Sequence, residues 1–126
     1  MTAYLSLEQV LSVAEAAVGE TPSVRDLGLL DSAVHRPQSE MFGRELYPDL
    51  FTKAAALLHS IALNRPLYDG NKRLAWTATD VFLRVNGVQI GPAEDDAYDF
   101  MISVADGTLS EVEEIAKVLR SWAEPR

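Results

Sequence analysis

Apolar residues recur every three or four positions along most of this chain, a spacing that places side chains on one face of an α-helix. The first such series runs from Leu7 to Val18 and ends at Gly19. Ser6 precedes it and Gln9 occupies the third helical position. The pattern therefore predicts an amphipathic opening helix that starts with a capping box and stops at a glycine.

The next part of the chain is predicted to hold two helices separated by an aperiodic segment. One helix is expected over residues 26–35, because the residue before Pro37 is disfavoured in the helical conformation. Residues 38–47 show no period, and we interpret them as an ordered loop or flap. Pro48 suits the first position of the following helix, which is apolar on nearly every side as far as Ile61 and should be central.

Three further helices are predicted in the C-terminal half. The first covers residues 74–86, and the second starts at residues 91–92 and is broken at residues 106–107. The last begins at Ser110, where Glu113 would complete a second capping box. No strand-length alternation or internal repeat interrupts these patterns, so they indicate an all-α protein.

The composition agrees with one folded domain over residues 1–126, and we expect a single-domain bundle of about six helices. A hydrophobic content of 48% with 24% charged residues excludes global disorder. The absence of cysteine excludes disulfides and thiolate metal sites. No signal-peptide pattern and no run of membrane-spanning length occurs, so we expect a cytoplasmic protein without membrane contact.

The formal net charge is −8, and the basic residues are scattered rather than aligned along one face. Binding to a nucleic acid depends on neutralising phosphates with clustered cations. Direct nucleic-acid binding is therefore not expected, and the acidic excess suits solubility or a basic partner segment.

Candidate chemistry is concentrated in residues 65–73, Arg-Pro-Leu-Tyr-Asp-Gly-Asn-Lys-Arg, which lead into the predicted helix over residues 74–86. The first turn of a helix offers unpaired N–H groups and the positive end of a dipole to an anion. With a glycine turn and two cations beside it, this segment predicts a nucleotide phosphate site. The same residues also suit a plain turn with a helix cap and solvated charges.

Each residue of this segment has a definite chemical use. Asp69 is the candidate magnesium ligand, since Mg²⁺ prefers carboxylate and phosphate oxygens; its alternative role is helix capping. Gly70 lets the backbone approach a ligand, and Asn71 can donate to a phosphate or stabilise the turn. Arg73 offers a planar fork to two phosphate oxygens, and Lys72 offers a compact charge.

Residues 65–73 resemble the signature of the Fic/Doc family, His-Xaa-Phe-Xaa-(Asp/Asn)-(Ala/Gly)-Asn-Lys-Arg in its Doc branch, and the match runs from Asp69 to Arg73. The resemblance extends over nearly the whole chain and implies the helical Fic/Doc fold. Arg65 stands where the family has its histidine, and Leu67 stands where it has phenylalanine. Leu67 keeps an apolar side chain, which we expect to face the core.

The resemblance also implies a reaction type. In the Fic branch, which transfers AMP, glycine usually stands at the position of Lys72 and a second arginine at that of Trp76, so both residues favour the Doc branch. Doc proteins are ATP-dependent kinases that transfer the γ-phosphoryl group to a threonine of elongation factor Tu and arrest translation. ATP and Mg²⁺ are then the expected cofactors, with Asp69 on the metal and the residues from Gly70 to Arg73 on the phosphates.

Arg65 conflicts with that activity. The family histidine accepts the proton of the target hydroxyl, whereas a guanidinium stays protonated. His59 lies in the apolar central helix and His35 at a helix end, so neither replaces the base. We therefore expect this chain to be catalytically disabled. Arg65 is either an engineered or selected replacement, which the intact phosphate residues favour, or the mark of a natural inactive relative.

By resemblance, the partner of this chain is a small antitoxin whose C-terminal segment folds on binding. The flap over residues 38–47 resembles the region with which Fic proteins hold a target backbone, and it also suits a plain surface loop. Two other functions stay open on the sequence. One is a Fic-type adenylyltransferase, and the other is a non-catalytic antitoxin-binding module, which Arg65 favours.

Overall fold

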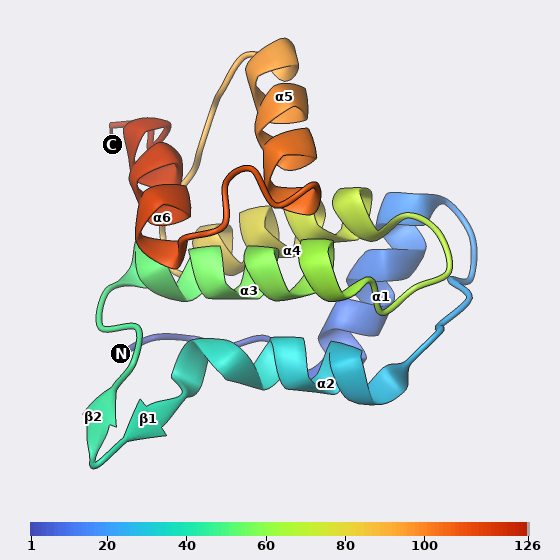
Figure 1. Cartoon of the computed structure of the whole chain (residues 1–126), viewed down its shortest axis with the longest axis horizontal. Coiled ribbons are helices and arrows are strands. Elements are labelled where there is room, and N and C mark those ends of the chain that lie inside the picture. The colour runs from blue at the N-terminus through green and yellow to red at the C-terminus, as the bar shows by residue number, and fades with distance from the viewer. Residues whose placement is uncertain (126) are drawn as a thin grey trace.

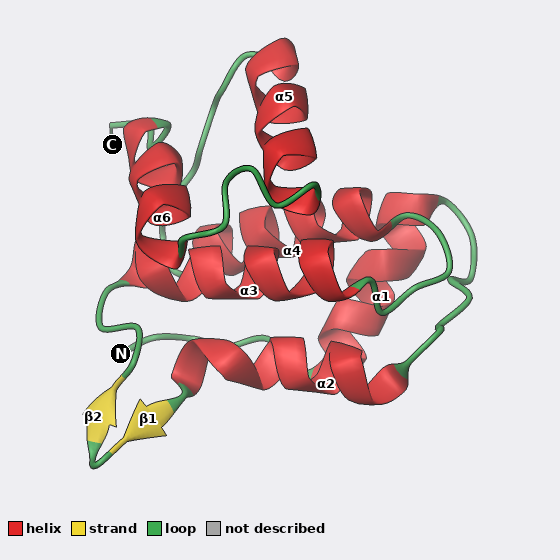
Figure 2. Cartoon of the chain, in the orientation of Figure 1, coloured by secondary structure: helices red, strands yellow, loops and turns green. Residues whose placement is uncertain are grey.

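The computed structural model describes residues 1–125, and these residues form six α-helices, one short 3₁₀ helix and a two-stranded hairpin (Figures 1 and 2). The all-α bundle expected from the sequence is confirmed. None of the helices in residues 1–125 is both long and apolar enough to cross a membrane. The elements are α1 (Leu7–Val18), α2 (Leu27–His35), η1 (Arg36–Gln38), β1 (Glu40–Met41), β2 (Arg44–Glu45), α3 (Leu50–Asn64), α4 (Asn71–Val85), α5 (Glu94–Ala105) and α6 (Val112–Ser121).

Helix α3 is the centre of the bundle, as its all-round apolar sequence predicts. It contacts α2, η1, α4, α5 and α6, and Figure 1 shows it running between α2 on one side and α5 on the other. Its residues from Thr52 to Leu58 are all buried. Because α3 is fixed on every side, its C-terminal end gives the following loop a rigid starting point.

Local capping sets where the helices begin. The predicted box at α1 is present: the Ser6 hydroxyl accepts the N–H of Gln9, whose side chain accepts the N–H of Ser6. The start predicted at Pro48 is wrong. Asp49 is the N-cap of α3 and forms a capping box with Thr52, so the helix starts at Leu50. The capping box satisfies two backbone donors, because Asp49 Oδ1 accepts the N–H of Thr52 and the Thr52 hydroxyl accepts the N–H of Asp49.

Two other helices start two or three residues later than predicted. Helix α5 starts at Glu94 rather than at residues 91–92, and α6 starts at Val112 rather than at Ser110. The N-cap of α6 is Glu111, which makes no side-chain capping bond, so the box predicted between Ser110 and Glu113 is absent. The break predicted at residues 106–107 agrees with the end of α5 at Ala105.

Residues 38–47, predicted as an aperiodic loop, contain a small antiparallel hairpin. Glu40 pairs with Glu45 and Met41 with Arg44, across a turn in which Phe42 and Gly43 have positive φ angles of 53° and 77°. Strands of two residues are too short to show alternation in a sequence. The turn leaves the Phe42 side chain 97% exposed at the tip, and the hairpin projects from the body of the protein (Figure 1).

The base of this hairpin is anchored to α3 by a buried lysine. The Lys53 side chain is only 2% exposed, and its ammonium donates to the carbonyl of Tyr47 and pairs with Glu45 Oε1 at 3.1 Å. A hairpin of this size is marginal by itself in water. Its position is therefore set by contacts with the helices rather than by its own pairing.

Arg36 makes a second attachment at the base of the hairpin. Its Nε donates to the Tyr47 hydroxyl at 2.9 Å, and its Nη1 lies 2.9 Å from both His59 Nδ1 and Ser60 Oγ. Burial and the neighbouring guanidinium lower the pKa of His59. The neutral imidazole can accept a hydrogen bond from Arg36 at Nδ1, so His59 serves the packing of α3, although its ring is only partly buried.

Candidate functional site

The candidate site begins in the loop between α3 and α4, which is held by a distant stretch of chain. Val24 and Leu67 form an isolated antiparallel bridge, and the Tyr68 N–H donates to the carbonyl of Ser23. The Arg25 side chain donates to the carbonyls of Asn64 and Arg65 at 2.7 and 2.8 Å. These bonds satisfy carbonyl groups that the end of α3 would otherwise leave free, and so fix the course of the loop.

Asn71 closes the loop from within. Its Oδ1 accepts the N–H of Leu67 and its Nδ2 donates to the carbonyl of Leu67, both at 2.9 Å. The Leu67 side chain is 1% exposed and faces the core, as predicted. Of the two roles considered for Asn71, stabilising the turn is the one that the structure contains.

The start of α4 carries no side-chain cap. Gly70 is the N-cap residue, with φ of 88°, and no side chain accepts a bond from the first turn. Asp69 Oδ1 accepts only the N–H of Gly70, at 2.9 Å, so the capping role considered for Asp69 is not observed. The first-turn N–H groups of α4 and a carboxylate oxygen of Asp69 are therefore available to a ligand.

Gly70 is also where α1 packs against this site. A Cβ atom at this position would lie 2.8 Å from Cγ2 of Val18, a distance that real Cβ atoms essentially never show. The glycine is thus required both by its positive φ and by the closeness of the last residue of α1. The packing of the opening helix consequently sets the position of the α4 N-terminus.

We expect Gly70→Ala to lower the free energy of unfolding by about 1–3 kcal/mol, through the left-handed backbone and the contact with Val18. Gly107→Ala is a matched control, because Gly107 has φ of 85° but nothing within 4 Å of the added atom. Urea denaturation of both variants, and of Gly70→Ala combined with Val18→Ala, separates the two contributions. If Gly70→Ala costs no more than Gly107→Ala, the packing of Val18 does not constrain this turn.

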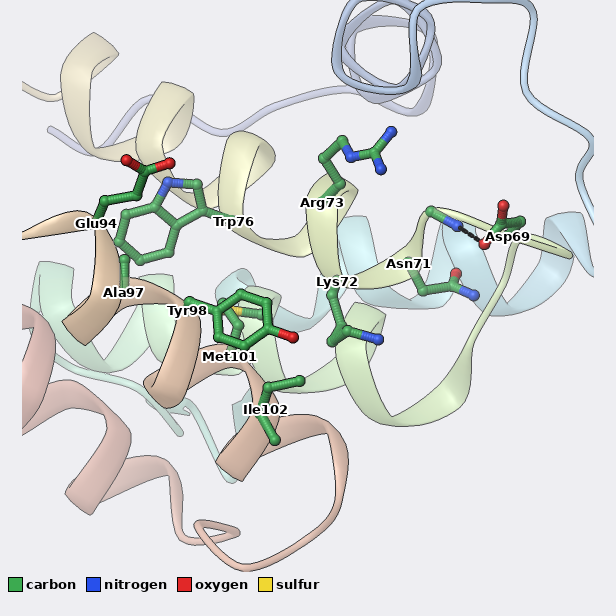
Figure 3. A pocket seen from close by; sticks show the side chains of 11 residues that line it. Asp69, Asn71, Lys72, Arg73, Trp76, Glu94, Ala97, Tyr98, Met101 and Ile102 are labelled. Carbon is green, nitrogen blue, oxygen red and sulfur yellow. Dashed lines mark hydrogen bonds between the residues drawn. The ribbon is translucent and has the colours of Figure 1, made fainter.

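The α4 N-terminus opens into a cavity of about 490 Å³, drawn in Figure 3. One end of the cavity is formed by the residues from Asp69 to Arg73, which the sequence predicted to act together. The side chains of Lys72 and Arg73 are exposed and make no hydrogen bond or ion pair within residues 1–125. Figure 3 shows Lys72 beside Tyr98 and Ile102, whereas the Arg73 guanidinium points away from them. The two cations thus face different parts of the site.

Arg65 is not among the residues that line this cavity. It is the C-cap of α3 and its exposed side chain extends from a left-handed backbone with φ of 49° and ψ of 65°. Among residues other than glycine, that conformation is enriched in asparagine, aspartate and histidine. Arginine is therefore a poor conformational match for a position at which the family has histidine.

The other end of the cavity was not predicted as part of the site. We call it the α5 wall, and it consists of one residue of α4 and five of α5: Trp76, Glu94, Ala97, Tyr98, Met101 and Ile102. The α5 members recur at helical spacing. That periodicity could have identified the face, but not the helix end to which it is opposed.

Known proteins resemble this chain over most of its length. The model of the Fic/DOC family matches residues 4–83, a range that includes the whole loop between α3 and α4. The chain is 49% identical over 112 residues to a protein named Toxin Doc of Mycolicibacterium smegmatis, covering 89% of this chain and 82% of that protein. It is 31% identical over 120 residues to a protein named Protein kinase doc of Escherichia phage P1, covering 93% of each.

Proposed function

The chain belongs to the Fic/Doc family, and from that membership we propose that it is a Doc-type toxin, by ancestry a protein kinase that uses ATP and Mg²⁺. The observation that carries the proposal is the uncapped N-terminus of α4, with Lys72 and Arg73 unpaired beside a cavity of nucleotide size. Backbone N–H groups, a helix dipole and two cations form a phosphate site there.

The residues present suit a magnesium nucleotide. Asp69 is exposed at the rim of the cavity, and the one carboxylate oxygen that is not bonded to Gly70 is free to ligate a hard cation. A nucleotide bound here supplies the phosphoryl group. Lys72 and Arg73 hold its phosphate oxygens, and Asn71 acts indirectly by keeping the loop closed around Leu67.

Phosphotransfer by this site is a displacement at the γ-phosphorus. A threonine hydroxyl of the target attacks, the bond between the γ-phosphorus and the bridging oxygen breaks, and ADP leaves while the hydroxyl proton passes to a base. The family places its histidine at position 65 for that proton, and the guanidinium of Arg65 cannot accept it. His59, which lies in α3, is no substitute, because its Nδ1 is hydrogen-bonded to Arg36. The chain with arginine at position 65 is therefore disabled in catalysis.

The partners follow from the same proposal. The target is elongation factor Tu, whose segment around the threonine would lie along the hairpin of β1 and β2, and the regulator is an antitoxin with a C-terminal segment that folds on binding. Lys53 and Arg36 support this assignment because they fix the base of the hairpin on α3.

A non-catalytic module that only sequesters the antitoxin is the second candidate, and Arg65 is the observation that favours it. A Fic-type adenylyltransferase is disfavoured by Lys72 and Trp76, which stand where that branch has glycine and arginine. The three possibilities differ in the chemical product that they leave on a target.

Mass spectrometry of purified elongation factor Tu, incubated with the Arg65→His protein and magnesium ATP, tests the proposal. We expect a threonine that gains a phosphoryl group, and we expect Lys72→Gly in the same background to lose that product, since the cation beside the phosphates has gone. An AMP adduct would identify an adenylyltransferase instead. The absence of any adduct from a folded protein would favour the sequestering module.

A further inference from the structure

We propose that the α5 wall is the subsite for the purine base of the nucleotide, with Trp76, Tyr98 and Met101 as its contact surface. The inference rests on the proposed function for the phosphates, since the wall and the α4 N-terminus line one continuous cavity (Figure 3). Nucleotide pockets combine an apolar surface with a few placed polar groups, and this cavity has both at opposite ends.

The indole of Trp76 is held rigidly at the wall. Its ring packs edge to face against Phe100 and Trp122, with centroids at 6.4 and 6.1 Å, and Phe100 and Trp122 are themselves 5.0 Å apart. Three mutually crossed rings leave the indole little freedom. A fixed aromatic side chain offers a base a stacking surface without a loss of side-chain entropy on binding.

Tyr98 adds an aromatic ring that the fold does not cover. Its side chain is 66% exposed, and no aromatic pairing or hydrogen bond holds it within the described residues. Met101 also lines the cavity, but it is only 6% exposed. The tyrosine ring in Figure 3 lies in front of Met101, between Trp76 and Lys72, where it can close over a planar ligand.

The charges of the cavity favour one orientation of a bound nucleotide. The cations Lys72 and Arg73 lie at the α4 end, whereas α5 begins with Glu94, Asp95 and Asp96. A triphosphate is attracted to the first end and repelled from the second. The carboxylate of Glu94, which lines the cavity, can instead accept a hydrogen bond from an amino group or a ribose hydroxyl.

The test compares ATP with inorganic tripolyphosphate, each with Mg²⁺, by titration calorimetry on the chain as written. Tripolyphosphate carries the phosphates without base or ribose. We expect ATP to bind about 5- to 100-fold more tightly, because stacking of a base on aromatic side chains commonly contributes that factor. Tripolyphosphate has the greater negative charge, so charge attraction alone would give the opposite order.

Three variants test whether the tighter binding of ATP comes from the α5 wall. Tyr98→Ala and Trp76→Leu should each remove most of the preference for ATP and leave tripolyphosphate binding unchanged. Trp122→Leu is the matched control, because Trp122 belongs to the same group of rings but does not line the cavity. It should lower the preference for ATP less than Trp76→Leu does, because Phe100 still packs against the indole of Trp76, and ATP should still quench the fluorescence of that remaining indole. Thermal unfolding shows whether each variant is folded. If Trp76→Leu is unstable, Tyr98→Ala still decides the test, because Tyr98 is exposed.

The outcomes separate this inference from the proposed function. If tripolyphosphate binds and ATP binds no more tightly, or if Tyr98→Ala and a folded Trp76→Leu both keep the preference, the base does not use the α5 wall, although the phosphate site stands. If neither ligand binds, the phosphate site and the base subsite are both wrong.

Discussion

Replacing Arg65 by histidine is expected to turn a protein that cells tolerate into one that arrests growth. Transfer of a phosphoryl group to a hydroxyl requires an acceptor for the hydroxyl proton, and a positioned base contributes on the order of 10²- to 10⁴-fold in rate. An imidazole titrates near neutrality and can act as that base, whereas a guanidinium cannot. The loop between α3 and α4 contains no histidine in the present sequence.

The backbone favours the same replacement. Arg65 has a left-handed conformation that histidine and asparagine adopt more readily than arginine, and its carbonyl and that of Asn64 are already held by Arg25. The histidine variant should therefore fold at least as well as the parent. The change affects the chemistry of position 65 without disturbing the loop that carries it.

Induced expression of the two proteins, with and without a cognate antitoxin, measures the effect. Arg65→Asn is the matched control, because asparagine also suits the left-handed backbone but has no basic nitrogen at neutral pH. Growth should stop with histidine alone and recover with the antitoxin. Harmless but folded Arg65→His protein would contradict the toxin assignment, and arrest by the parent or by Arg65→Asn would show that a base at this position is unnecessary.

Arg73→Ala is expected to abolish detectable binding of magnesium ATP. The proposed phosphate site consists of backbone N–H groups and two cations, and the guanidinium of Arg73 is the group that can bond two phosphate oxygens at once. Hydrogen bonds to charged groups contribute about 1.5–3 kcal/mol each, so even one such bond lost weakens binding about 10- to 150-fold. A weak complex then falls below the range of titration calorimetry.

Arg84→Ala provides the control, since Arg84 lies at the opposite end of α4 and is paired with Asp80 at 2.9 Å. It removes the same charge from the same helix, and it should leave ATP binding close to that of the parent. Equal binding by Arg73→Ala and the parent would show that Arg73 is not a phosphate ligand. An equal loss in both variants would indicate a general effect of net charge.

Local interactions explain why the helices and the main chemical segment could be predicted from the sequence. The apolar period of each helix and the capping box at Ser6 depend on residues no more than four positions apart. Residues 69–73 are likewise close in sequence, and their predicted chemistry follows from their position at the start of one helix. The start predicted at Pro48 was wrong because the adjacent Asp49 is a stronger N-cap, so that the helix begins at Leu50.

Tertiary structure decided the features that depend on residues distant in the sequence. Val18 excludes a side chain at Gly70, Arg25 fixes the carbonyl of Arg65, and Lys53 is buried by pairing with the hairpin. The α5 wall likewise meets the α4 N-terminus because α4 and α5 both pack on α3 and contact each other. The sequence alone thus determined which chemical groups lie at a helix N-terminus, because that depends on neighbouring residues. The packing of helices decided the cavity around them, because contacts between distant residues leave no periodic pattern in a sequence.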